Sequence, residues 1–189
     1  GGPYQGRGTS TCAAENPSNI LITHVLFHDV QRTNMPTAHP DCLQFFGTSG
    51  AVVDSSTFVR CGTSNVMARP ATGLWSGNVI DNLTFSNNLF SPAVEGGAEV
   101  VVGAHQDVCG AVTFTGNDGG AGGISSFDCS SYTKLLVTNN TFGGMSRYGC
   151  QVLSATRNLV LTGNRFAAGA FSCGLQAVSG EPVRSPTGT

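Results

Sequence analysis

An eight-residue pattern recurs six times along the 189 residues of the chain and limits the possible folds more than any other feature. Two apolar residues separated by one position open each copy, and five of the six copies close on phenylalanine. The copies are ILITHVLF (20–27), AVVDSSTF (51–58), LTFSNNLF (83–90), VTFTGNDG (112–119), LLVTNNTF (135–142) and LVLTGNRF (159–166). Apolar residues at alternate positions are typical of a strand with one buried face, so each copy predicts a short strand.

The spacing between successive copies varies while the pattern inside them stays the same. The closing positions 27, 58, 90, 119, 142 and 166 are separated by 31, 32, 29, 23 and 24 residues. Loops of variable length between constant strands are typical of a solenoid, in which each coil packs against its neighbours. Proline and glycine interrupt the chain too often for long helices. We therefore expect an all-β solenoid of about six coils.

Asparagine occupies one position, two residues before the closing position, in the last four copies: Asn88, Asn117, Asn140 and Asn164. The residues that precede this position across the copies are mostly types that tolerate a left-handed backbone. The combination predicts a sharp turn inside each coil, with the asparagine side chains directed inward. Amides stacked one strand spacing apart, about 4.8 Å, can satisfy one another's hydrogen bonds, which predicts an internal asparagine ladder. Exposed Asn-Gly hairpin turns are the alternative.

A second apolar segment follows each copy after a loop. These segments are CLQFFG (42–47), NVMAR (65–69), EVVVGA (99–104), GISSFD (123–128), CQVLSA (150–155) and CGLQAVS (173–179). Three short strands per coil and an internal asparagine ladder resemble the right-handed parallel β-helix of the pectate-lyase-like superfamily. The resemblance covers about residues 18–179 and implies that fold. Because this architecture serves lyases, hydrolases, epimerases, phage tailspikes and adhesins, the resemblance selects no single activity.

The whole chain, residues 1–189, is expected to form a single β-helix domain. Residues 1–17 form an irregular N-terminal segment, residues 18–179 carry the coils, and residues 180–189 form a C-terminal tail. Only 11% of the residues are charged and the formal net charge is −2, so the chain lacks the basic field that attracts nucleic acid. No apolar run approaches the roughly 20 residues that cross a bilayer. We therefore expect no nucleic-acid partner and no membrane span.

The chain contains seven cysteines, without the CxxC and histidine spacing of a zinc site. Disulfides formed in an oxidising compartment are expected, and the protein is therefore expected to be secreted and extracellular. The candidate pairs are Cys150 with Cys173, Cys109 with Cys129, and two of the three residues Cys12, Cys42 and Cys61. The first two pairs occupy similar places in neighbouring coils, within the span that a disulfide bridges. A buried column of reduced cysteines is the alternative.

The two ends of the predicted solenoid carry unpaired strand edges, which are normally covered by a cap. No capping helix is evident in residues 1–17 or in the tail EPVRSPTGT (181–189). We expect either the remainder of a longer chain or another protein chain to cover an end. The second alternative implies a homo-oligomer.

Polar residues gather where the variable loops lead into the second apolar segments. In the superfamily that the chain resembles, substrate clefts run along the sheet of these segments. The candidate catalytic residues are His39, Asp41, Arg60 and Arg69. Elimination from an acidic sugar needs an arginine or a metal ion to neutralise the carboxylate and a base such as His or Arg to remove a proton. The residue pattern specifies no cofactor, and calcium is the candidate if a metal takes the neutralising role.

Further candidates for contacts with a polysaccharide surround these four residues: Gln44, Trp75, His105, Arg147 and Tyr148. Trp75 would be a platform for a sugar ring or a plug that closes its own loop. His105 would pair with Asp107 or form part of a metal site with it.

Structural roles compete with catalytic ones for the first four candidates. His39 and Asp41 would hold the longest variable loop, HDVQRTNMPTAHPD (28–41), through hydrogen bonds to the backbone. Arg60 and Arg69 would be solvated surface groups.

Three classes of function follow from these residues. The first is a carbohydrate-active enzyme, most plausibly a lyase that acts on an acidic polysaccharide. The second is a non-catalytic glycan-binding or surface module. The third is a structural piece of an appendage or tailspike, which would associate through an uncovered end and bind no glycan.

Overall fold

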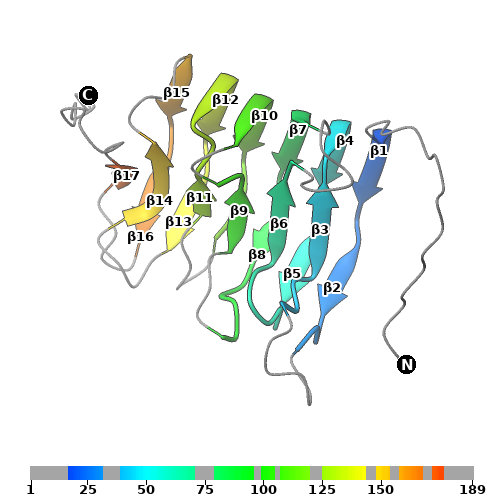
Figure 1. Cartoon of the computed structure of the whole chain (residues 1–189). Helices are drawn as coiled ribbons and strands as arrows, with labels where there is room; N and C mark the ends of the chain where they lie inside the picture. The colour runs from blue at the N-terminus through cyan, green and yellow to red at the C-terminus, as the bar shows by residue number, and fades with distance from the viewer. Residues whose placement is uncertain are drawn as a thin grey trace, which may run out of the picture.

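A computed structural model describes residues 17–31, 39–70, 79–95, 99–104, 107–119, 125–143, 148–153, 158–167 and 172–176. Within these residues every helix or strand element is a strand, and all paired strands run parallel. The strands stack side by side in the order of the coils, from β1 at one end to β15 and β17 at the other (Figure 1). The predicted all-β parallel solenoid is confirmed.

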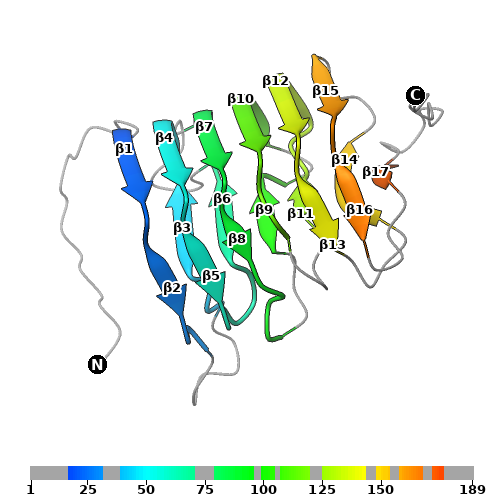
Figure 2. The ribbon, with the colours of Figure 1, turned by 180° about the vertical axis from the view of Figure 1, so that it is seen from behind.

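The first sheet contains the strands that open the repeated pattern (Figure 2). In spatial order it consists of β1 (Ser18–Thr23), β4 (Thr48–Asp54), β7 (Ile80–Ser86), β10 (Val108–Thr115), β12 (Ser131–Thr138) and β15 (Leu159–Thr162). The register aligns the leading apolar positions, so that Ala51 pairs with Leu83 and Val53 with Phe85. Because equivalent residues lie in one column, the apolar side chains form continuous rows inside the solenoid.

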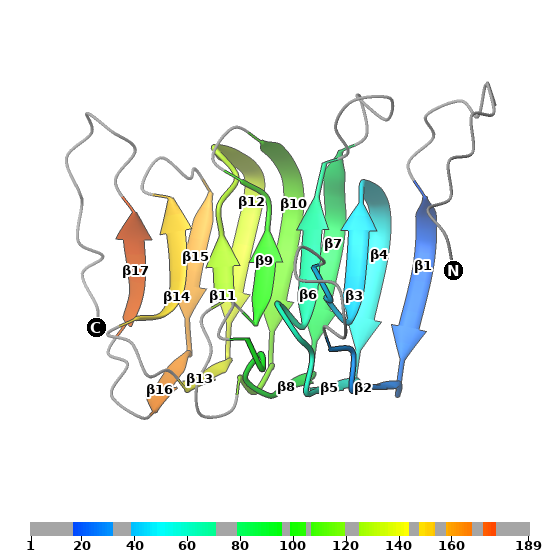
Figure 3. The same cartoon turned by 60° about the horizontal axis from the view of Figure 1, so that its bottom comes forward.

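The second sheet contains the apolar segments that follow each loop. Its strands are β3 (Leu43–Phe46), β6 (Val66–Arg69), β9 (Val100–Val102), β11 (Ser125–Phe127), β14 (Tyr148–Leu153) and β17 (Ser172–Gln176). The two sheets lie opposite each other in the solenoid (Figure 3). Their inward side chains form the core, in which Leu83, Phe114 and Phe127 are fully or almost fully buried.

Short strands at the corner between the two sheets complete the coils. They are β2 (Leu26–His28), β5 (Thr57–Val59), β8 (Leu89–Phe90), β13 (Thr141–Gly143) and β16 (Arg165–Ala167). Single bridges from Asp118 to Leu89 and to Thr141 connect β8 with β13. Among the described residues, five of the six coils therefore have three short strands, as the sequence predicts, and in the fourth the isolated bridges of Asp118 take the place of the corner strand.

The asparagines of the repeated pattern form a chain of hydrogen bonds along the interior. The Asn117 side-chain oxygen accepts bonds from the backbone N–H and the amide nitrogen of Asn88, both at 3.0 Å. Asn140 accepts the same two bonds from Asn117, and Asn164 accepts them from Asn140. Each amide nitrogen also donates to a strand carbonyl, as Asn117 does to Phe85 at 3.0 Å. The side chains of Asn88, Asn117 and Asn140 are buried, which excludes exposed hairpin turns at these positions.

The residue before each ladder position has a left-handed backbone in all six coils. The φ angles are between +48° and +66° for His24, Ser55, Asn87, Gly116, Asn139 and Gly163. A Cβ atom on Gly116 would lie 2.6 Å from Asn87 Oδ1, so the asparagine of one coil occupies the space beside the glycine of the next. The predicted sharp turn is confirmed, and glycine leaves room where the neighbouring coil presents an asparagine.

The closing phenylalanines stack on one another beside the ladder. Phe27 and Phe58 have ring centroids 4.7 Å apart, and Phe90 continues the column. Gly119 breaks the pattern, and Phe114 from β10 fills the gap, with its ring stacked between those of Phe90 and Phe142. The solenoid therefore keeps its aromatic column through the one coil that lacks the closing aromatic residue.

Two disulfides are present among the described residues. Cys109–Cys129 joins two neighbouring coils, as predicted. Cys42–Cys61 takes two of the three cysteines that the sequence left in competition. The backbones of Cys150 and Cys173 are in register on β14 and β17, but their side chains and all of Cys12 lie outside the described residues. The alternative of a fully reduced cysteine column is wrong for the four bonded residues.

Candidate functional site

The strands of the second sheet lie side by side in the order of the coils (Figure 3), so side chains at equivalent positions form rows on its outer face. Phe45 and Ala68 point into the core, so the residues that alternate with them lie on the outer face. The register forms one row from Gln44, Met67, Val101 and Ser126. Gln44 is exposed, Met67 and Val101 are partly buried, and Ser126 is buried. A second row begins with Phe46 beside Arg69. We call this surface, from β3 to β11, the outer face.

His39, Asp41 and Gln44 form one cluster where the chain enters β3. The Gln44 amide nitrogen donates to Asp41 Oδ2 at 2.7 Å and reaches the His39 carbonyl oxygen at 3.5 Å. The Asp41 side chain is 9% exposed, and its Oδ1 has no hydrogen-bond partner among the described residues. Gln44 therefore orients the Asp41 carboxylate and leaves one carboxylate oxygen free to accept a further bond.

Two covalent and steric features hold this cluster in place. The Cys42–Cys61 disulfide joins the residue after Asp41 to the next coil. Pro40 packs against Gly62, where an added Cβ atom would lie 2.4 Å from the proline ring. The Gly62 N–H also donates to the Pro40 carbonyl at 3.1 Å. The end of the long loop is thus fixed at the corner that leads into β3.

Arg60 is held by Asp29 rather than by the cluster. Its Nε and a terminal nitrogen donate to the two oxygens of Asp29, and His28 Nδ1 lies 2.7 Å from Asp29 Oδ2. The hydrogen bond from Arg60, followed by that from His28, lowers the pKa of Asp29 well below its ordinary value. Asp29 and Arg60 both have left-handed backbones at the same place in successive coils. This exposed ion pair belongs to the corner after β2 and β5.

Arg69 lies on the outer face and faces a carboxylate from the third coil. Its Nε is 3.5 Å from Asp107 Oδ2, and the same oxygen accepts the Ala104 N–H at 2.7 Å. The contact at 3.5 Å is an ion pair without a hydrogen bond, since the buried Arg69 Nε has no hydrogen-bond partner among the described residues. Arg69 therefore remains able to donate to another acceptor.

The four predicted catalytic residues thus lie in three separate sets of contacts. Within the described residues, no hydrogen bond or ion pair joins His39 or Asp41 to either arginine, and none joins Arg60 to Arg69. Gln44, one of the residues predicted to contact a polysaccharide, belongs to the cluster of His39 and Asp41 through its hydrogen bond to Asp41. The sequence placed these residues on neighbouring segments, but it did not reveal their partners.

Two residues of this surface escaped the sequence analysis. Phe46 is 54% exposed on the outer face, although it was treated only as part of an apolar strand. Asp128 follows β11 and has a buried oxygen, Oδ1, with no hydrogen-bond partner in the described part of the chain. The alternation of CLQFFG could have placed Phe46 outside, because Phe45 beside it occupies the inward position. Nothing in the sequence pattern distinguishes Asp128.

Several of the predicted contact residues fall outside the described part of the chain. Trp75, His105 and Arg147 lie in undescribed segments, and of Tyr148 only the backbone, in β14, is described. The suggested pair between His105 and Asp107 is therefore untested, whereas Asp107 does pair with Arg69.

Neither a metal-binding cluster nor a membrane-spanning helix is found among the described residues. Within them, no group of three or more His, Cys, Asp or Glu side chains is placed to hold a metal ion. No helix in this part of the chain has the length and apolar character that crossing a membrane requires.

Comparison with known proteins identifies a family but no individual relative. A family model described as a right-handed β-helix region matches residues 5–181, which include every strand of the structure. Searches of curated proteins and of solved structures gave no match.

Proposed function

Because the chain belongs to the family of right-handed β-helix proteins, we propose that it is a glycan-binding module that holds a polysaccharide along the outer face of the second sheet. The observation that carries the proposal is the exposed Phe46 ring beside Arg69, with Gln44 two residues before it on the same strand. An aromatic ring next to polar donors and acceptors is a common composition of a sugar-binding surface.

The regular geometry of the surface favours an extended ligand. The strands β3, β6, β9 and β11 are successive neighbours in the sheet. Side chains at equivalent positions on neighbouring strands are therefore about 4.8 Å apart. An extended polymer can lie across the strands and pass one position of the row at each step, although Gln44, Met67 and Val101 differ in chemistry. This argument supports a polysaccharide over a small molecule, which would need an enclosed pocket.

Binding is better supported than cleavage by the contacts of the candidate residues. Hydrolysis of a glycoside needs two carboxylates about 5–10 Å apart that flank the scissile bond, and Asp41 and Asp107 are each engaged with another side chain. Elimination needs a base and a neutralising group that act on the same sugar. His39 and Arg69, the candidates for these roles, belong to different sets of contacts.

A polysaccharide lyase is the second candidate, and one observation favours it. The exposed His39 lies next to the buried Asp41, whose Oδ1 has no hydrogen-bond partner among the described residues. The Asp41 N–H donates to the His39 carbonyl at 3.0 Å, and a carboxylate with a free oxygen can take part in proton transfer. Calcium would be the metal that neutralises the substrate in that case.

Secretion is part of the proposal. Two disulfides among the described residues are characteristic of proteins that fold in an oxidising environment. An extracellular protein meets polysaccharides as components of surfaces and matrices, which agrees with the proposed ligand class.

The experiment is a binding screen on immobilised neutral and acidic polysaccharides with the wild type and two variants. Phe46→Ala removes the exposed ring, and Leu21→Ala removes an exposed apolar side chain from the outer side of the first sheet as a control. We expect Phe46→Ala to weaken binding by about tenfold or more, as loss of a stacking contact does, and Leu21→Ala to have no effect. Absence of binding to every polysaccharide would refute the proposal. Release of ultraviolet-absorbing unsaturated products would establish the lyase instead.

A further inference from the structure

The first coil leaves part of the hydrophobic interior uncovered. Ile20, Ile22 and Phe27 are only partly buried, whereas the residues of the second coil in register with them are fully buried. Five of the ten exposed large apolar side chains in the described part of the chain also belong to the first coil: Leu21, Val25, Leu26, Val30 and Phe46. We call the side of residues 17–31 and 39–46 that faces away from the second coil the first-coil end. Such a concentration of exposed apolar groups is typical of an interface.

The strands of the first coil also have unpaired edges. Among the described residues, β1 pairs only with β4, β2 only with β5 and β3 only with β6. The Asp54 carbonyl on β4 accepts the His24 N–H at 3.2 Å, so it points toward the first coil. Thr23 is in register with Asp54, and its carbonyl therefore points away from the second coil, as do the backbone groups of Leu21. An exposed edge of this kind can pair with a strand of another chain.

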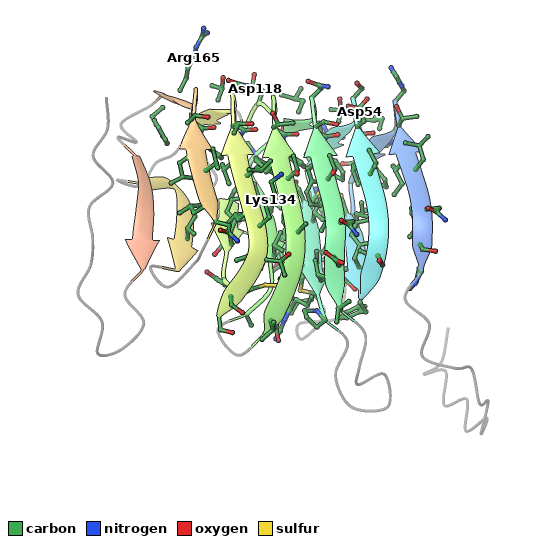
Figure 4. All side chains as sticks on the ribbon, turned by 90° about the horizontal axis from the view of Figure 1, so that it is seen from above. Asp54, Asp118, Lys134 and Arg165 are labelled. Atoms are coloured by element: carbon green, nitrogen blue, oxygen red, sulfur yellow. A yellow bond between two sulfur atoms is a disulfide. The ribbon has the colours of Figure 1, made fainter. Side chains whose placement is uncertain are left out.

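Charge does not oppose contact between two copies of this end. The described part of the first coil contains no lysine or arginine and two carboxylates. Asp29 is paired with Arg60 of the second coil, and Asp41 is 9% exposed and accepts a hydrogen bond from Gln44. All the charged residues labelled in Figure 4 lie on later coils: Asp54, Asp118, Lys134 and Arg165. Two identical first-coil ends can therefore meet with little repulsion between like charges.

The asparagine ladder disfavours head-to-tail stacking of two copies. Each ladder residue donates to the side-chain oxygen of the next coil, as Asn140 does to Asn164. If the sixth coil of one copy stacked on the first coil of another, Asn164 would face Val25, whose side chain has no acceptor. The Asn164 N–H and one amide proton would lose about 1–3 kcal/mol each if buried unpaired. Contact between two first-coil ends makes no such demand, because the Val25 N–H already donates to Ser56 Oγ at 3.2 Å.

A twofold axis can join two first-coil ends through both sheets. An axis that is perpendicular to the solenoid and runs from β1 toward β3 places β1 beside β1 of the second copy, and β3 beside its β3. The rotation reverses the direction of the strands, so both new pairs are antiparallel and can form hydrogen bonds. Such an interface is isologous and closes at two copies. Residues 17–31 and 39–46 of each copy approach the number that a standard interface uses, about 20–30 residues per partner.

We propose that two copies of this chain associate through their first-coil ends, with β1 paired to β1 across a twofold axis. The contact covers Ile20, Ile22 and Phe27 and continues both sheets into the second copy. In either register that joins the backbone groups of Leu21 and Thr23, Leu21 lies opposite or diagonal to Leu21 of the second copy. The interface uses the edge of the first coil rather than the outer face of the second sheet, so it does not depend on glycan binding.

The test is sedimentation equilibrium of the full chain from about 1 µM to about 200 µM, which brackets a micromolar dissociation constant. We expect a reversible equilibrium between monomer and dimer in this range, because the interface lies near the lower end of the standard size. Leu21→Lys places two like charges near the twofold axis and should raise the dissociation constant at least tenfold. Val108→Lys is the control, since Val108 is 64% exposed against 68% for Leu21 but lies on β10 in the fourth coil. Melting curves of both variants report whether the fold is retained.

Each other possible result overturns the proposal. A wild type that stays monomeric over the whole range would do so, as expected if another part of the chain covers the first coil. Growth beyond two copies would indicate head-to-tail stacking instead. An unchanged dissociation constant in Leu21→Lys, or an equal rise in both lysine variants, would show that the contact is elsewhere. A dimer that persists in denaturing electrophoresis without reductant would be covalent and would also contradict the proposed interface.

Discussion

Removal of one asparagine from the interior ladder tests the physical basis of the fold. Asn117 accepts two hydrogen bonds from Asn88 and donates to Phe85 and Asn140. In Asn117→Ala, the Asn88 backbone N–H and one proton of its amide lose their acceptor inside the core. At about 1–3 kcal/mol for each buried donor left unpaired, the expected loss is about 2–6 kcal/mol. This is a large share of the 5–15 kcal/mol that typically stabilises a domain.

Two further substitutions separate hydrogen bonding from other effects of the change. Asn117→Ser should cost less than Asn117→Ala, because in the second coil the Ser56 hydroxyl already accepts the Val25 N–H at 3.2 Å. Asn87→Gly alters an exposed position whose left-handed backbone suits glycine and should change stability by less than about 1 kcal/mol. The assay is equilibrium unfolding in urea, followed by circular dichroism with the disulfides intact. Equal stabilities of Asn117→Ala and Asn87→Gly would refute the reasoning.

Two other predictions concern the turns of the coils. Gly116→Ala should lower the melting temperature, because its φ is +64° and the new Cβ would lie 2.6 Å from Asn87 Oδ1; Asn87→Gly in the same chain should restore part of the loss, and the absence of any rescue would show that the close contact is not the cause. The Asp29–Arg60 pair should stabilise the fold above the ordinary aspartate pKa of 3.8, and this contribution should disappear as the pH falls through the lower folded pKa. The difference between the urea midpoints of the wild type and Arg60→Gln should therefore be constant above about pH 5 and narrow as the pH falls from 4 to 2, whereas a constant difference over that range would contradict the assignment.

The fold could be predicted from the sequence because the interior repeats with a constant pattern. Leu83 and Phe85 occupy the same inward columns as Val112 and Phe114, and alternation alone places such residues in the core. The Asn88 and Asn117 positions share a register for the same reason. Phe114 shows the limit of this reasoning. Nothing in the eight-residue pattern indicates that its ring replaces the aromatic residue missing at position 119.

The candidate site could be predicted only in part, because its contacts depend on loops rather than on the repeat. The Asp29–Arg60 pair was within reach, since both residues follow a closing phenylalanine by two positions. The pair between Arg69 and Asp107 was not, because Arg69 ends a strand while Asp107 lies in the loop before β10.

Mapping of a bound oligosaccharide by backbone NMR shifts tests the central claim, that a glycan lies across the outer face of the second sheet. The probe is an oligosaccharide cut from the polymer that binds best in the screen. We predict shifts that follow the row of Gln44, Met67, Val101 and Ser126 and that leave the strands of the first sheet unchanged. Shifts confined to the first sheet, or spread over the ends of the solenoid, would contradict the account.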